Sequence, residues 1–147
     1  MQLISSSFSH NQPIPDKYGC DGEDINPPLE ISEVPENTAS LALIMDDPDA
    51  PIPGSFVHWT LWNIDPATTE IPENSVPEGA VQGTTNFGSV GYGGPCPPSG
   101  EHRYFFRLYA LDKKLDLAEG ASREELNQAM EGSVLDSTEL IGLFSRR

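Results

Sequence analysis

A run of glycine and proline at residues 91–100 restricts the fold of this chain more than any other segment. Seven of these ten residues are glycine or proline, namely Gly91, Gly93, Gly94, Pro95, Pro97, Pro98 and Gly100. Proline fixes φ and removes a hydrogen-bond donor, whereas glycine reaches conformations that are closed to other residues. The run therefore predicts a stiff, sharply bent loop. It leads into the aromatic-rich residues 102–111, which are typical of a strand. A shaped loop that delivers His102 and Tyr104 to the start of a strand indicates a small binding site.

Two further segments predict strands. Residues 41–45 form a continuous apolar run of strand length, which indicates a strand buried on both faces. Alternation in residues 56–64 predicts one face made of Phe56, His58, Thr60, Trp62 and Ile64. The same rule in residues 102–111 predicts one face made of His102, Tyr104, Phe106 and Leu108, and an opposite face made of Arg103, Phe105, Arg107 and Tyr109. Residues 2–8 are expected to form an edge strand.

One helix is indicated clearly. Ser122 and Glu125 have the spacing of a capping box, which satisfies free backbone N–H groups at a helix start. An apolar stripe begins at Leu126, and Gly132 stands where a glycine commonly follows the end of a helix.

The whole pattern predicts a mainly β fold. Segment 137–145 fits either a helix or a strand. The 14 prolines and 13 glycines keep every element short. We therefore expect a single domain over residues 1–147, built as a sandwich of antiparallel or mixed sheets with short peripheral helices.

Composition excludes several classes of partner. The chain has 23 acidic and 8 basic residues and a net charge of −15, so no basic face is expected for nucleic acid or for an anionic membrane. The excess of acidic residues is consistent with a role in solubility or with adaptation to high salt. No apolar run approaches the ~20 residues of a membrane span, and the N-terminus lacks the pattern of a signal peptide. These features predict a cytoplasmic protein, in which Cys20 and Cys96 are expected to be thiols unless folding brings them together.

The residues suited to chemistry are carboxylates and histidines. Asp46, Asp47 and Asp49 follow the buried strand at 41–45. They fit an ordinary turn, but their mutual repulsion requires hydrogen bonds or a cation. His58 interrupts an apolar strand and fits either a core residue or a ligand-binding group. His10 lies in a polar segment and is expected at the surface.

Three assemblies of these residues can be compared. A zinc site from His58, His102 and Asp47 is chemically sensible but lacks the short spacing of zinc signatures. A nucleophilic pair of Cys96 and His102 lacks an orienting partner. The third assembly, which we favour, is an anion pocket in which His58, His102 and the Tyr104 hydroxyl donate hydrogen bonds. Backbone N–H groups around Gly93 and Gly94 would complete it as a nest. Asp47 would orient a histidine or meet a cationic group of the ligand.

Two segments resemble the signatures of the phosphatidylethanolamine-binding protein family. They are Asp47-Pro48-Asp49-Ala50-Pro51 with His58, and the stretch from Gly94-Pro95-Cys96-Pro97-Pro98 to His102-Arg103-Tyr104. Residues 14–29 and 139–142 also resemble its bacterial and archaeal branch, called Raf-kinase-inhibitor-like. The resemblance implies a β-sandwich with a small pocket at one end of the central sheet, which takes phosphoethanolamine-type head groups and other small anions.

By the same resemblance, the ligand-binding positions are Asp47, Pro48, His58, Gly94, Pro95, His102 and Tyr104. Phe56 takes the place of an aromatic wall residue. The expected function is non-enzymatic binding of small anionic or phosphorylated ligands, with no catalytic residue, metal or cofactor. The alternatives are a protein-interaction inhibitor of a kinase or serine protease, and a hydrolase built on Asp47 and the histidines. The resemblance also suggests a homodimer.

Overall fold

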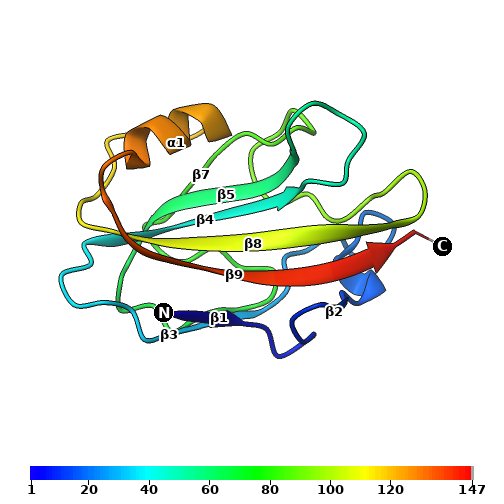
Figure 1. The fold of residues 1–147 in the computed structure, drawn as a ribbon, viewed down its shortest axis with the longest axis horizontal. Helices are drawn as coiled ribbons and strands as arrows, with labels where there is room; N and C mark the ends of the chain where they lie inside the picture. Colours follow the sequence, from blue (N-terminus) through cyan, green and yellow to red (C-terminus); the bar gives the residue numbers. More distant parts are fainter. Residues whose placement is uncertain (147) are drawn as a thin grey trace.

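A computed structural model describes residues 1–146 of the chain, in which two sheets pack face to face (Figure 1). In chain order, the elements are β1 (Gln2–Ile4), β2 (Gln12–Pro13), a 3-10 turn (Asp16–Tyr18), β3 (Leu29–Ser32), β4 (Ser40–Asp47), β5 (Phe56–Ile64), β6 (Glu70–Ile71), β7 (Val81–Gln82), β8 (Glu101–Leu111), α1 (Arg123–Met130) and β9 (Val134–Ser145).

The larger sheet has six strands in the order β2-β9-β8-β4-β5-β7, and the smaller has the order β1-β3-β6. All the strand pairs are antiparallel except β2 with β9, which is parallel. The predicted mainly β sandwich of mixed sheets is therefore confirmed.

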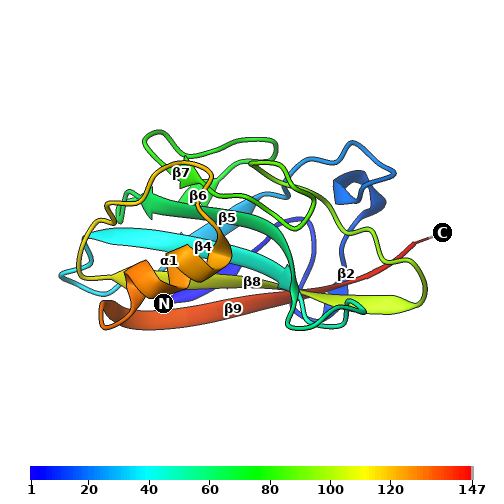
Figure 2. The same ribbon diagram turned by 90° about the horizontal axis from the view of Figure 1, so that it is seen from above.

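The core lies on both faces of the larger sheet. On one face the small sheet contributes Leu3, Leu29, Ile31 and Ile71 to a cluster with side chains of β4, β5, β8 and β9. On the other face, Leu126 and Met130 of α1 pack on Ala42 and Ile44 of β4. Figures 1 and 2 show α1 and the strands β1 and β3 on opposite sides of the large sheet. This double cover explains why every residue of β4 is buried, as the apolar run predicted.

Strand β5 departs from the predicted alternation because it is irregular at two places. The pairing of β5 with β4 shifts in register at two points of β4. One shift lies between Met45 and Asp46, and the other lies between Leu41 and Leu43. The prediction that Trp62 and Ile64 lie on the same face of the strand is therefore wrong. Ile64 packs in the small-sheet cluster with Trp59 and Leu61, whereas Trp62 packs toward α1. An extra residue in a strand reverses the faces of the residues beyond it.

The ends of the chain settle the open assignments. Residues 137–145 belong to strand β9, which pairs along its length with β8. The predicted edge strand at the N-terminus is confirmed but is shorter, at Gln2–Ile4. The capping box of α1 is present, and Gly132 follows the helix with φ +79°. No helix within residues 1–146 is long and apolar enough to cross a membrane.

The two cysteines form a disulfide, so folding does bring them together and they are not free thiols. Cys20 and Cys96 are 76 residues apart in sequence, but their Cα atoms lie 5.4 Å apart. The backbone supports the same contact, because the Cys20 N–H donates to the Pro95 carbonyl oxygen at 3.0 Å. Disulfides persist in oxidising compartments and, inside cells, in hyperthermophiles. The cytoplasmic location stays a prediction, since disulfides inside the cells of other organisms are usually transient.

Removing this disulfide is expected to destabilise the fold. Because the bridge closes a long loop, the double variant Cys20→Ser/Cys96→Ser should lose about 4 kcal/mol of unfolding free energy in urea denaturation. A reductant should lower the stability of the wild type and leave that of the double variant unchanged. Equal stability of the oxidised wild type and the double variant would contradict this account.

Candidate anion-binding pocket

A cavity of about 220 Å³ opens where β4 ends and β8 begins. It is lined by Asp47, Ala50, Pro51, Ile52, Phe56, His58, Phe87, Cys96, Pro97, Pro98, His102 and Tyr104. Four of the seven residues expected to bind a ligand therefore meet at one recess, although they come from three strands. The other three, Pro48, Gly94 and Pro95, do not line it.

Asp47 and His102 form a buried pair at the floor of the recess. His102 Nδ1 donates to Asp47 Oδ2 at 2.7 Å, across the ends of β8 and β4. The other carboxylate oxygen, Oδ1, accepts the backbone N–H of Asp49 at 2.8 Å. Both oxygens are thus engaged, and Asp47 is only 2% exposed. The structure favours the orienting role predicted for Asp47 over contact with a ligand cation.

The neighbouring carboxylates have separate partners. Asp46 bonds Arg107 Nε at 3.0 Å and Arg123 at 3.3 Å. Asp49 accepts three hydrogen bonds from Arg103, each at 2.9 Å. The backbone N–H and Nε donate to Oδ2, and Nη2 donates to Oδ1. These contacts supply the cations that the clustered carboxylates were predicted to need.

His58 is held by an exchange of hydrogen bonds with the glycine-rich loop. Its Nδ1 lies 2.8 Å from the Gly93 carbonyl oxygen, and the Gly93 N–H donates to the His58 carbonyl oxygen at 2.9 Å. Rings of Phe56, Phe87 and Tyr104 surround it at centroid distances of 5.0, 5.2 and 5.1 Å. Burial lowers the pKa of His58, with the Gly93 carbonyl and the Asp47 charge opposing that effect.

The predicted backbone nest at Gly93 and Gly94 is wrong. The Gly93 N–H is used by His58, and the Gly94 N–H donates to Asp24 Oδ1 at 2.7 Å. The glycines instead permit close packing, because a Cβ at Gly94 would collide with the Tyr18 carbonyl oxygen. Gly94 and Pro95 therefore shape the loop from behind the recess.

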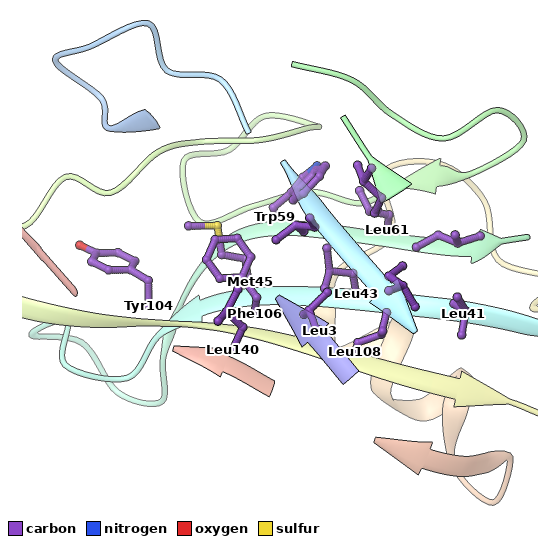
Figure 3. Packing of buried hydrophobic residues seen from close by; sticks show 14 of the residues in the cluster. Leu3, Leu41, Leu43, Met45, Trp59, Leu61, Tyr104, Phe106, Leu108 and Leu140 are labelled. Atoms are coloured by element: carbon purple, nitrogen blue, oxygen red, sulfur yellow. The ribbon is translucent and has the colours of Figure 1, made fainter. Parts of the chain in front are cut away.

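Tyr104 places an unpartnered hydroxyl in the lining. Its side chain is fully buried, yet its oxygen has no hydrogen-bond partner among residues 1–146. Figure 3 shows the ring at one end of the core cluster, with the hydroxyl directed away from the other labelled side chains. Burial, reinforced by the negative charge of Asp47, raises the pKa of this phenol far above 10. It is therefore a hydrogen-bond donor at any physiological pH.

The walls of the recess are apolar, and sequence reasoning missed most of them. Phe87 and Ile52 lie in loops without strand periodicity, so no pattern marked them. Cys96 also lines the recess, but its sulfur is bonded to Cys20. That bond rules out the alternative of a Cys96–His102 nucleophilic pair. Within residues 1–146, no group of three His, Cys, Asp or Glu side chains is arranged to hold a metal ion.

Comparisons with known proteins agree with this architecture. The sequence profile described as phosphatidylethanolamine-binding protein matches residues 4–145. A UPF0098 protein of Methanothermobacter thermautotrophicus is 52% identical over 151 residues, covering 99% of each chain. The crystal structure of a phosphatidylethanolamine-binding protein homologue from Chlamydia trachomatis has a TM-score of 0.95 at 42% identity, covering 99% of this chain and 97% of that one. Escherichia coli YbcL, described as a member of the mammalian family, has a TM-score of 0.93 at 30% identity, covering 99% and 98%.

The chain therefore belongs to the phosphatidylethanolamine-binding protein family. Its relatives from archaea and bacteria match nearly all of it, and the solved structure from Chlamydia trachomatis shares its fold.

The Asp49–Arg103 pair should be detectable in an acid titration as a lowered pKa of Asp49. The Arg103 hydrogen bonds lower the pKa of Asp49 to about 2, against ~3.9 for an unfolded aspartate. The pair therefore stabilises the folded state above pH ~4, and this stabilisation is lost as the pH falls toward 2. Carboxyl NMR should give a pKa of about 2 in the wild type and a value near 3.9 in Arg103→Gln. An unshifted value in the wild type would contradict the pairing.

Removing the Tyr104 hydroxyl should not weaken the fold. Because the hydroxyl is buried without a hydrogen-bond partner in the described part of the chain, Tyr104→Phe is expected to leave the unfolding free energy unchanged or to raise it by about 1 kcal/mol. Urea denaturation of the ligand-free protein measures this. A loss of 1 kcal/mol or more would mean that the hydroxyl has a structural partner after all. Phe106→Leu, in the packed core, serves as the destabilising control.

Proposed function

We propose that this protein is a non-enzymatic binding protein for small anionic or phosphorylated ligands, held in the recess between β4, β5 and β8. The observation that carries the proposal is the Tyr104 hydroxyl, which is buried beside the Asp47–His102 pair and has no hydrogen-bond partner within residues 1–146. An unsatisfied buried donor costs about 1–3 kcal/mol. A ligand that accepts the hydrogen bond of this hydroxyl would remove the cost, which explains why the protein keeps the group.

The size of the recess supports a small ligand or a head group. Its 220 Å³ is below the ~300–1,000 Å³ typical of pockets for drug-sized ligands. A phosphate-sized group would reach the polar atoms at the floor, and a short attached chain would lie against Phe56, Phe87 and Ile52 at the apolar walls. Family membership adds a precedent, because the family is named for binding phosphatidylethanolamine.

The chemistry of the lining supports binding over catalysis. Both oxygens of Asp47 already accept hydrogen bonds. The Cys96 sulfur is in a disulfide, and the high pKa of Tyr104 makes its phenolate unavailable as a nucleophile. Among the lining residues, only the histidines remain as acid–base groups. We therefore expect no turnover of a bound phosphoester.

The binding proposal is tested by titration with phosphoethanolamine, followed by backbone NMR. Shifts should concentrate at the residues that line the recess. The variants His102→Gln and Tyr104→Phe should each weaken binding by about tenfold or more, the value of one lost hydrogen bond to a charged group.

The matched control is His10→Gln, because His10 is an exposed histidine outside the recess. This variant should bind as the wild type does. Shifts spread over the acidic surface, or equal affinity in all four proteins, would contradict the proposal. Release of inorganic phosphate during the titration would contradict the non-enzymatic assignment.

A further inference from the structure

The disulfide is part of one wall of the recess. Cys96 lines the cavity together with the two prolines that follow it, Pro97 and Pro98. Its sulfur is bonded to Cys20, which follows the 3-10 turn and does not line the cavity. The bridge therefore fastens this wall to a segment outside the recess, which is 76 residues away in sequence.

The two segments that the bridge joins are not held by a sheet or a helix. Residues 19–28 and 91–100 belong to no element of secondary structure. Three hydrogen bonds accompany the bridge, and each joins the glycine-rich loop to residues 18–24. They run from the Cys20 N–H to the Pro95 carbonyl oxygen at 3.0 Å, from the Gly94 N–H to Asp24 Oδ1 at 2.7 Å, and from the Tyr92 hydroxyl to the Tyr18 carbonyl oxygen at 2.9 Å. Water can replace hydrogen bonds of this kind, so the bridge is the lasting tether of the loop.

The position of this loop determines the state of His58. The Gly93 carbonyl oxygen lies 2.8 Å from His58 Nδ1, and because a carbonyl oxygen only accepts, Nδ1 carries the proton. Gly93 stands three residues before Cys96. His102 differs, since its Nδ1 is held at 2.7 Å by Asp47, and both of those residues lie in strands. Release of the loop would therefore free His58 and leave His102 in place.

The bridge can be reached without unfolding of the sheets. Cys20 and Cys96 are both partly exposed, and neither belongs to the two core clusters. A small dithiol can reduce such a bridge in two balanced steps. One thiolate attacks a cysteine sulfur to form a mixed disulfide, and the second thiolate then closes the reductant into its own cyclic disulfide. The protein gains two electrons and two protons, and both cysteines become thiols.

We propose that the Cys20–Cys96 bridge is a redox switch that controls the ligand affinity of the recess. This inference rests on the proposed function. In the oxidised protein, the wall and the Gly93 carbonyl group are held in place before a ligand arrives, so binding has little disorder to remove. In the reduced protein the ligand has to order the loop, which lowers the affinity. Oxidising surroundings would favour retention of the ligand, and reducing surroundings would favour its release.

Calorimetry with phosphoethanolamine tests the switch by comparing the oxidised protein with protein reduced by dithiothreitol. Reduction should weaken binding about tenfold or more, a factor within the range typical of coupling between two sites. The double variant Cys20→Ser/Cys96→Ser is the matched control, and it should bind as the reduced wild type does, with or without dithiothreitol. Equal affinities of the oxidised and reduced wild type would overturn the inference and leave the binding proposal standing. Binding by neither form would overturn the binding proposal, and the inference with it.

The same coupling should appear in the redox equilibrium, because linkage between two equilibria is reciprocal. Phosphoethanolamine, at a concentration that saturates both forms, should make the disulfide harder to reduce. The ratio of reduced to oxidised dithiothreitol that reduces half of the protein should rise by the factor found in calorimetry. Alkylation of the free thiols, followed by mass spectrometry, measures the reduced fraction. A ratio that does not change with the ligand would overturn the inference.

NMR of the ligand-free protein separates a local switch from a general loss of stability. On reduction, the imidazole nitrogens of His58 should show a mixture of the two tautomers, whereas His102 should keep a protonated Nδ1. The amide signals of β8 and β9 should stay where they are in the oxidised protein, except next to the loop. Loss of these strand signals, or an unchanged His58, would overturn the inference.

Discussion

The neutralisation of the acidic end of β4 is the interaction on which the site depends. Three carboxylates stand within four residues, and strand alternation sends Asp46 and Asp47 to opposite faces of the sheet. Asp46 meets arginines of β8 and α1, so it ties the helix to the sheet. Asp47 meets His102, and Asp49 meets Arg103. Each contact fixes one part of the recess, and together they remove the repulsion that would otherwise separate these groups.

The loop before β8 supplies the second half of the frame. Gly93 can lie against the Phe87 ring only because it has no Cβ, and this approach brings its carbonyl oxygen to His58. The disulfide and the Asp24 side chain hold the loop from the far side. The glycines and prolines thus serve chiefly to place a carbonyl group and an apolar wall. Binding itself is assigned to side chains of the strands.

Local patterns in the sequence predicted the parts of the fold that local forces determine. The apolar run of β4, the two faces of β8 and the capping box of α1 all follow from spacing within a single segment. Residue chemistry, supported by the resemblance to a family, located the four side chains that meet at the recess. Features that depend on distant partners were missed. Cys20 and Cys96 are 76 residues apart, and the bulge in β5 arises from pairing with β4. The hydrogen bond from the Gly94 N–H to Asp24 joins residues 70 apart in sequence, so the sequence could not distinguish a free donor from an occupied one.

The central claim is that Gly93 and Asp47 fix the two imidazoles with their Nδ1 atoms protonated, which leaves both Nε2 atoms to the ligand. Long-range ¹H–¹⁵N NMR of the imidazole nitrogens in the ligand-free protein at pH 7.5 measures this most directly. The account predicts a protonated Nδ1 at both His58 and His102, with Nε2 of His58 at the chemical shift of an unprotonated nitrogen. A protonated Nε2 and bare Nδ1 at His58 would contradict it, because the Gly93 carbonyl oxygen could then receive no hydrogen bond from the ring.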